Sequence, residues 1–183
     1  MSSALHSPAP RYTGVAIALH WLLALMIIGA FGMGVYMTDL PVSPSRLKLY
    51  NWHKWAGVTI LALSALRLLW RLGHKPPADV PMPAWQATAA HATHGLLYLL
   101  FFAVPLIGWA YSSAAGYPIV WFGVLQLPDF VPVDKALAET LKPWHGRAAF
   151  AMLLLVLVHV AGAIKHQLVD RDGLINRMRF GTR

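Results

Sequence analysis

The sequence contains no cysteine among its 183 residues. This absence excludes disulfide bonds, thiolate-held iron–sulfur clusters, cysteine-ligated zinc sites, and haem attached covalently through a C-x-x-C-H motif. Any metal in this protein must therefore be bound by nitrogen or oxygen atoms. The nine histidines are the most informative residues for that role.

Charged residues are also scarce: they make up only 12% of the chain, whereas 57% of the residues are hydrophobic. Because a water-soluble domain carries about a quarter charged residues, this composition excludes most soluble folds and indicates an integral membrane protein. The formal net charge is +8. We expect these basic residues to orient the chain in lipid, and we expect no nucleic-acid partner.

Four segments are long and apolar enough to cross a bilayer, which needs roughly 20 apolar residues. They lie at about 12–38, 51–71, 87–111 and 144–166. The sequence therefore predicts an all-α fold, an integral membrane four-helix bundle that forms a single domain over residues 1–183. An even number of spans places both termini on the same side of the membrane.

The connections differ in length and charge. Nine lysine and arginine residues lie on the side of the termini and six on the other side. This bias predicts that both termini are cytoplasmic. The longest connection, about 112–143, then lies outside. Its last part, Val133 to Lys142, is predicted to form a short helix at the membrane interface.

Four histidines fall at two depths in the predicted bundle. His145 and His159 are 14 residues apart on the fourth segment, which is roughly 21 Å along one helix face. His53 lies level with His145, and His20 lies level with His159. A zinc ion needs three or four ligands at one level, whereas a haem needs two opposed imidazoles. The pattern therefore favours one haem between each pair of histidines.

Other roles for histidine stay open. His91 and His94 lie three residues apart near the inner start of the third segment, and His94 competes with His159 as the inner ligand. Alternatively, these two residues exchange protons with a quinone or hydrogen-bond to a haem propionate. A histidine in a membrane helix can also simply hydrogen-bond to a neighbouring helix. His6, His74 and His166 are expected to be peripheral.

Five short motifs carry a family resemblance. They are L-H-W at 19–21, N-W-H-K at 51–54, H-A-T-H-G at 91–95, W-H-G at 144–146 and V-H-V-A-G at 158–162. In this order the chain resembles the bacterial cytochrome b561 family over roughly residues 11–179. The resemblance implies a multi-pass protein of the bacterial inner membrane with two b-type haems, in electron exchange with the quinone pool. It implies His20 and His159 as ligands of the inner haem, and His53 and His145 as ligands of the outer, periplasmic haem.

Haems whose axial positions are all held by histidine transfer electrons and keep no open site for substrate. We expect Arg67 and Arg71 to bind haem propionates at the inner end. Basic residues at the outer end are expected to hold propionates or to attract a small anionic donor; they are Lys48, Lys54, Lys142 and Arg147. The first hypothesis is therefore electron transfer from an external one-electron donor, such as superoxide, to ubiquinone.

Two alternatives remain from the sequence. The first is a cytochrome b anchor subunit with the same haems, which receives electrons from a dehydrogenase or hydrogenase docked on the long outer loop. The second is a haem-free transporter or proton channel whose histidines relay protons or bind metal.

Overall fold

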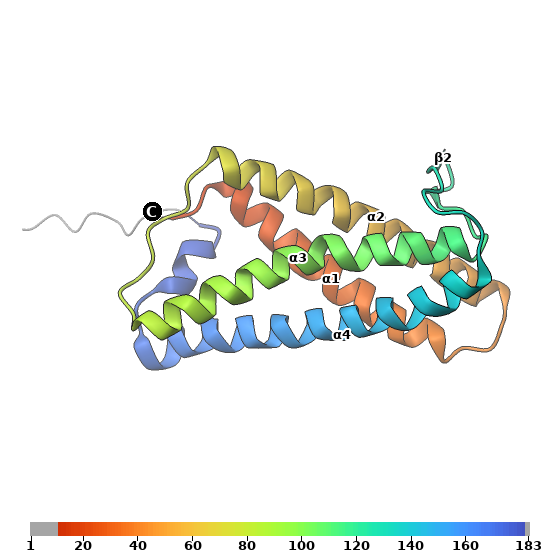
Figure 1. Ribbon diagram of the computed structural model, residues 1–183. Coiled ribbons are helices and arrows are strands. Elements are labelled where there is room, and N and C mark those ends of the chain that lie inside the picture. Colours follow the sequence, from red (N-terminus) through yellow and green to blue (C-terminus); the bar gives the residue numbers. More distant parts are fainter. Residues whose placement is uncertain (1–10, 182–183) are drawn as a thin grey trace, which may run out of the picture.

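The computed structural model describes residues 11–181, which form a bundle of four long helices with a small β-hairpin at one end (Figure 1). The helices are α1 (Gly14–Thr38), α2 (Pro44–Gly73), α3 (Ala84–Ala114) and α4 (Lys135–Lys165). All four are long and apolar enough to cross a membrane. The structure thus confirms the predicted helical class with four membrane-length helices.

Two helices begin earlier than expected. The Ser43 Oγ accepts a hydrogen bond from the Arg46 backbone N–H (3.2 Å) and starts α2 at Pro44 rather than near residue 51. The Asp134 carboxylate accepts one from the Leu137 N–H (3.1 Å) and starts α4 at Lys135 rather than near residue 144. Such caps satisfy N–H groups that the first turn leaves free. The short helix predicted over 133–142 is therefore the first part of α4, which continues through Pro143.

The bundle consists of two helical hairpins, because α1 packs along α2 and α3 packs along α4. A cluster of buried apolar side chains joins the two hairpins; its members are Leu23, Ile27, Ile60, Leu97, Val104 and Met152. Other large apolar side chains point outward, for example Leu25 (69% exposed) and Leu154 (63% exposed). An apolar surface on long helices is what lipid contact requires.

The connection between α3 and α4 contains a β-hairpin, in which β1 (Val120–Trp121) pairs antiparallel with β2 (Leu125–Gln126). Phe122 and Gly123 close the turn with φ values of 51° and 74°. This connection is shorter than the loop expected over 112–143, since α3 extends to Ala114 and α4 begins at Lys135.

After α4 the chain forms a π-helical turn (His166–Asp170) and a short 3₁₀ helix (Leu174–Met178), and then folds back on the start of α1. The Trp21 indole N–H donates to the Met178 carbonyl (2.8 Å), and the Tyr12 N–H donates to the Arg177 carbonyl (3.3 Å). Both ends of the described chain therefore lie at the same end of the bundle (Figure 1). We call this the terminal end, and the opposite end, which carries the hairpin, the loop end.

Candidate functional site

Two of the predicted histidines face each other near the loop end. His53 lies on α2 and His145 on α4, and their ring centroids are 6.0 Å apart with an interplanar angle of 89°. A metal–imidazole nitrogen bond is about 2.0 Å long, so two imidazoles on opposite sides of one metal have centroids roughly 6 Å apart. The spacing of His53 and His145 therefore suits one shared metal centre.

Both rings of this loop-end pair are held by backbone carbonyl groups. The His53 Nδ1–H donates to the Ala30 carbonyl, and the His145 Nδ1–H donates to the Val104 carbonyl, each over 3.0 Å. A carbonyl oxygen can only accept, so the proton of each neutral ring lies on Nδ1 and the Nε2 lone pair stays available. This is the arrangement that orients a metal-ligating histidine.

A glycine lies beside each of these rings, one helical turn after the accepting carbonyl. A Cβ atom at Gly34 would lie 3.1 Å from Cε1 of His53, and one at Gly108 would lie 2.8 Å from Cε1 of His145. Any larger residue would therefore push the ring away from its carbonyl. These two glycines carry no signal in the sequence alone, because they become significant only once the rings are placed beside them.

The two histidines line a hollow between the helical hairpins, and its other walls are apolar. These lining residues are Ile27, Ala30, Phe31, Gly57, Ile60, Phe101, Val104, Pro105, Ala149 and Met152. The hollow is thus apolar on its sides and carries one imidazole from α2 and another from α4. These features fit the b-type haem expected here.

Three histidines meet toward the terminal end. The ring of His159 on α4 lies 6.1 Å from that of His20 on α1, and 5.2 Å from that of His94 on α3. The structure thus brings together the expected inner pair, His20 and His159, and adds the competing His94 to the same group. The two histidines of the loop-end pair have no such third neighbour among the ring pairs of residues 11–181.

Arg67 binds directly to this inner group. Its guanidinium donates to Nδ1 of His20 (2.9 Å) and to the Tyr98 hydroxyl (3.3 Å). A guanidinium has no acceptor, so Nδ1 of His20 accepts and the proton of the neutral ring lies on Nε2. His20 therefore carries the opposite tautomer to His53 and His145, and its Nε2 becomes a metal ligand only after that proton moves.

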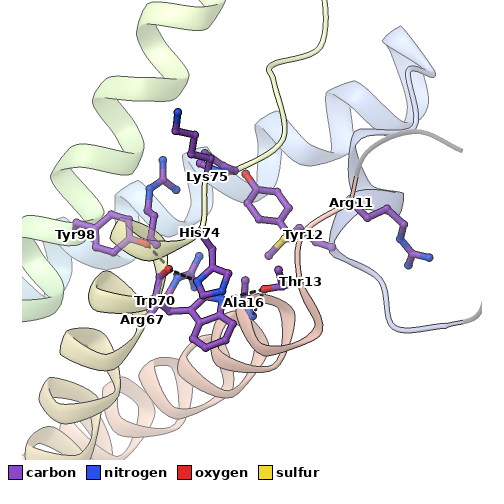
Figure 2. A pocket seen from close by; sticks show the side chains of 12 residues that line it. Arg11, Tyr12, Thr13, Ala16, Arg67, Trp70, His74, Lys75 and Tyr98 are labelled. Atoms are coloured by element: carbon purple, nitrogen blue, oxygen red, sulfur yellow. Dashed lines mark hydrogen bonds between the residues drawn. The ribbon is translucent and has the colours of Figure 1, made fainter. Parts of the chain in front are cut away.

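Arg67 also lines a basic pocket at the terminal end. The pocket includes Arg11, Arg71, His74 and Lys75, and no carboxylate of residues 11–181 lines it. Figure 2 shows Arg67, Trp70 and His74 reaching it from the end of α2, and Tyr98 reaching it from α3. Arg67 and Arg71 both lie over the Tyr98 ring, each with its guanidinium carbon 5.8 Å from the centroid. These positive groups lie on the side of the bundle where the sequence predicts haem propionates.

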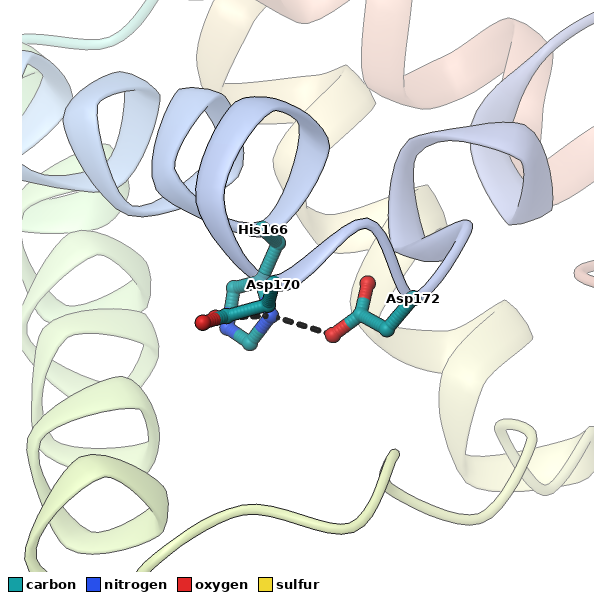
Figure 3. A group of neighbouring side chains, drawn as sticks. All are labelled: His166, Asp170 and Asp172. Atoms are coloured by element: carbon teal, nitrogen blue, oxygen red, sulfur yellow. Dashed lines mark hydrogen bonds and ion pairs between the residues drawn. The ribbon is translucent and has the colours of Figure 1, made fainter.

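Two histidines expected to be peripheral make defined contacts, whereas His6 lies outside the described residues. His74 stacks on Trp70 with centroids 3.9 Å apart. His166 is part of an ion-pair network with Asp170 (3.2 Å) and Asp172 (2.6 Å), as Figure 3 shows. Lys165 also binds the Asp170 carboxylate at 2.6 Å. Partial burial acts to raise the pKa of Asp172, but hydrogen bonds from the Leu174 N–H and from His166 outweigh it and lower that pKa.

The predicted basic residues at the loop end point in different directions. Lys54 donates to the Ser112 hydroxyl (3.1 Å) and to the Tyr117 carbonyl (3.2 Å), which ties α2 to the start of the long connection. The exposed Arg147 lies over the Trp144 ring, 5.4 Å from its centroid. Lys48 and Lys142 are exposed. Four basic side chains therefore lie at the loop end, and none of them lines the hollow between His53 and His145.

Known proteins share this chain's sequence over nearly its whole length. Residues 11–181 match the family described as prokaryotic cytochrome b561. Cytochrome b561 homolog 2 of Escherichia coli (strain K12) is 33% identical, over 92% of this chain and 90% of the relative. A protein of Yersinia pestis named probable superoxide oxidase CybB is 30% identical, over 92% of this chain and 95% of the relative.

These similarities cover the two histidine levels and all four helices together. They confirm the resemblance inferred from the histidine motifs. The chain belongs to the prokaryotic cytochrome b561 family, a family of membrane electron-transfer proteins that bind haem b.

Proposed function

We propose that this protein binds two b-type haems and transfers electrons across the bacterial inner membrane from external superoxide to ubiquinone. The overall reaction would consume two superoxide ions, one ubiquinone and two protons, and would release two molecules of oxygen and one ubiquinol. When bound, haem supplies a reversible one-electron couple.

The observation that carries the proposal is the geometry of the loop-end pair. His53 and His145 oppose each other across an apolar hollow, and each keeps Nε2 free because its Nδ1–H is bound to a backbone carbonyl. If both imidazoles bound one haem iron, no coordination position would stay open, so this level suits electron transfer rather than substrate binding at the metal.

We propose that the inner histidines bind the second haem. His159 lies 14 residues from His145 on the same helix, which is roughly 21 Å along its axis. We propose His20 as its partner ligand. The hydrogen bond from Arg67 to His20 would then be exchanged for a bond to a propionate, which agrees with the basic pocket that Arg67 and Arg71 line.

At the outer end, positive charge would favour an anionic donor. Lys48, Lys142 and Arg147 are exposed around the His145 end of α4 and the start of α2. Such a concentration of positive charge raises the rate of encounter with a small anion, and salt weakens the effect. The relative in Yersinia pestis that is named a probable superoxide oxidase supports this choice of donor.

Quinone reduction needs protons as well as electrons, and we propose that it takes place at the inner, cytoplasmic end. His91 lies one helical turn before His94 on α3, and its Nε2 binds the Asp79 carboxylate at 3.0 Å. The two imidazoles would hold exchangeable protons between the surface and the inner histidine group.

The test is quinone reduction by the purified chain alone. With superoxide generated in the assay, we expect ubiquinone to be reduced without any other protein, at a rate that falls as salt rises. The alternative of an anchor subunit predicts reduction only in the presence of a co-purifying dehydrogenase or hydrogenase. Strict dependence on such a partner would overturn the proposal.

A further inference from the structure

The β-hairpin between α3 and α4 lies beside the bundle, at a level below its outer limit. Figure 1 shows the hairpin, labelled at β2, projecting sideways, while the connection between α1 and α2 extends further along the bundle axis. A loop that served only as an aqueous link would be expected at the end of the helices. A role as an aqueous link alone therefore does not explain why this hairpin lies beside the helices.

Hydrogen bonds from two tryptophans hold the hairpin at this height along α2. The Trp55 indole N–H donates to the Val120 carbonyl (2.6 Å), and the Trp121 indole N–H donates to the Thr59 hydroxyl (3.2 Å). Trp55 and Thr59 belong to the part of α2 that follows His53 toward the bilayer centre. Because α2 is a membrane-length helix, the hairpin lies against the side of a span.

The tip of the hairpin is apolar and exposed. Val124 is 89% exposed, Phe122 57% and Leu125 52%. Phe122 also has a positive φ of 51°, a conformation that is unfavourable for a residue with a side chain. The Phe122 ring contacts the rings of Trp55 and Trp121, with centroids 5.4 and 5.0 Å away, and its exposed part would gain from contact with an apolar phase.

The sequence around the tip contains no charge. From Gly95 to Pro128, a run of 34 residues, there is no Asp, Glu, Lys, Arg or His. Only the first part of this run belongs to α3, which ends at Ala114. A charge-free stretch that continues through a connecting loop is typical of a segment that stays in contact with lipid.

We propose that the hairpin inserts its tip, Phe122 to Leu125, into the headgroup region of the outer leaflet. The apolar tip continues the outward-facing apolar surface of the bundle, and Trp55 and Trp121 take the interfacial position that tryptophan favours. Loop backbone is excluded from the hydrocarbon core itself. Some backbone groups of the tip already have hydrogen-bond partners within the turn. The Gly123 N–H donates to the Val120 carbonyl, and the Val124 N–H donates to the Trp121 carbonyl. The partner is therefore a phospholipid surface.

The absence of cysteine makes the test direct, because each introduced thiol is the only one in the chain. Val124→Cys reports on the tip. Val42→Cys is the matched control: it is also a valine, 84% exposed, but lies in the connection between α1 and α2 at the outer limit of the bundle. Both variants are prepared as full-length, haem-loaded protein in nanodiscs of phosphatidylethanolamine and phosphatidylglycerol.

The readouts are the rate of alkylation by a charged maleimide and cross-linking to a diazirine-bearing phospholipid. Apolar surroundings raise a thiol pKa, and one unit lowers the thiolate fraction tenfold. We therefore expect Val124→Cys to react about tenfold more slowly than Val42→Cys, and the tip peptide to carry a lipid adduct. In denaturant the two thiols should react equally fast.

Two results would overturn the proposal. Equal alkylation rates in nanodiscs would place the tip in water. Slow alkylation without a lipid adduct, together with a dimer formed through a bifunctional maleimide, would show that a second copy of the chain covers the tip. If Val124→Cys does not retain haem, Leu125→Cys probes the same surface.

Discussion

Each imidazole of the loop-end pair depends on a glycine beside it. A methyl group at Gly108 would lie 2.8 Å from Cε1 of His145, closer than Cβ atoms approach other heavy atoms. Overpacking of this kind costs about 1–3 kcal/mol, which exceeds the gain of about 1 kcal/mol that alanine brings to a helix. The ring should therefore shift away from the Val104 carbonyl.

We predict that Gly108→Ala weakens binding at the loop-end level and removes up to half of the b-type haem absorbance. Gly32→Ala is the control, because this helical glycine does not line the hollow and nothing lies within 4 Å of the added atom. Both variants are compared by pyridine haemochrome spectra after identical purification. Full haem content in Gly108→Ala would show that the ring position does not govern binding.

The ligand histidines give a second prediction at this scale. His53→Ala should lose the outer haem and His159→Ala the inner one, each leaving about half of the haem absorbance, since each level binds its haem with its own pair. The comparison with His94→Ala decides the inner pairing. If His94→Ala removes the inner haem and His20→Ala retains it, the pair is His94 with His159.

At the scale of elements, the segment after α4 is held by the network of His166, Asp170 and Asp172. The pKa of Asp172 is lowered in the folded protein. Its carboxylate therefore stabilises the fold at pH values above the ordinary pKa of aspartate. This contribution is lost as the pH falls through the lowered folded value.

We predict that Asp172→Asn lowers the Tm at pH 6, and that the difference from the unaltered protein shrinks as the pH falls below about 4. The measurement is thermal unfolding in detergent between pH 3 and pH 6. Asp129→Asn serves as the control, since the Asp129 side chain makes no hydrogen bond or ion pair within residues 11–181. A Tm difference that is constant with pH would contradict the assigned role of the Asp172 carboxylate.

The helices were predictable from the sequence, but their starts and the hairpin were not. Hydropathy locates the apolar part of each span, whereas Ser43 and Asp134 begin α2 and α4 in polar stretches that hydropathy does not include. The strands of the hairpin have two residues each, too few for an alternating pattern to be visible. Their position depends on hydrogen bonds to Trp55 and Thr59, which belong to a distant part of the chain.

The histidine levels were predictable because the helical rise converts residue number into depth. The tautomers were not, because they depend on partners from other helices: the Ala30 and Val104 carbonyls for the loop-end pair, and Arg67 for His20. The excess of basic residues was likewise visible in the sequence. That some of them line one pocket beside Tyr98 could be seen only in the folded structure.

At the scale of the whole molecule, the two ends of the bundle differ in chemistry. The terminal end carries the basic pocket and the third histidine, and the loop end carries the apolar hollow and the hairpin. We predict that the terminal end faces the cytoplasm. A fluorescent protein fused after residue 183 should fold and emit, whereas alkaline phosphatase fused there should be inactive. The reverse result would invert the orientation.

The central claim is that two histidine levels bind two haems in one chain. The most direct measurement is the haem-to-protein ratio of the purified protein, determined by pyridine haemochrome and quantitative amino-acid analysis, together with the reduced-minus-oxidised spectrum. We expect two non-covalent b-type haems per chain. A ratio of one, or a spectrum without b-type bands, would contradict it.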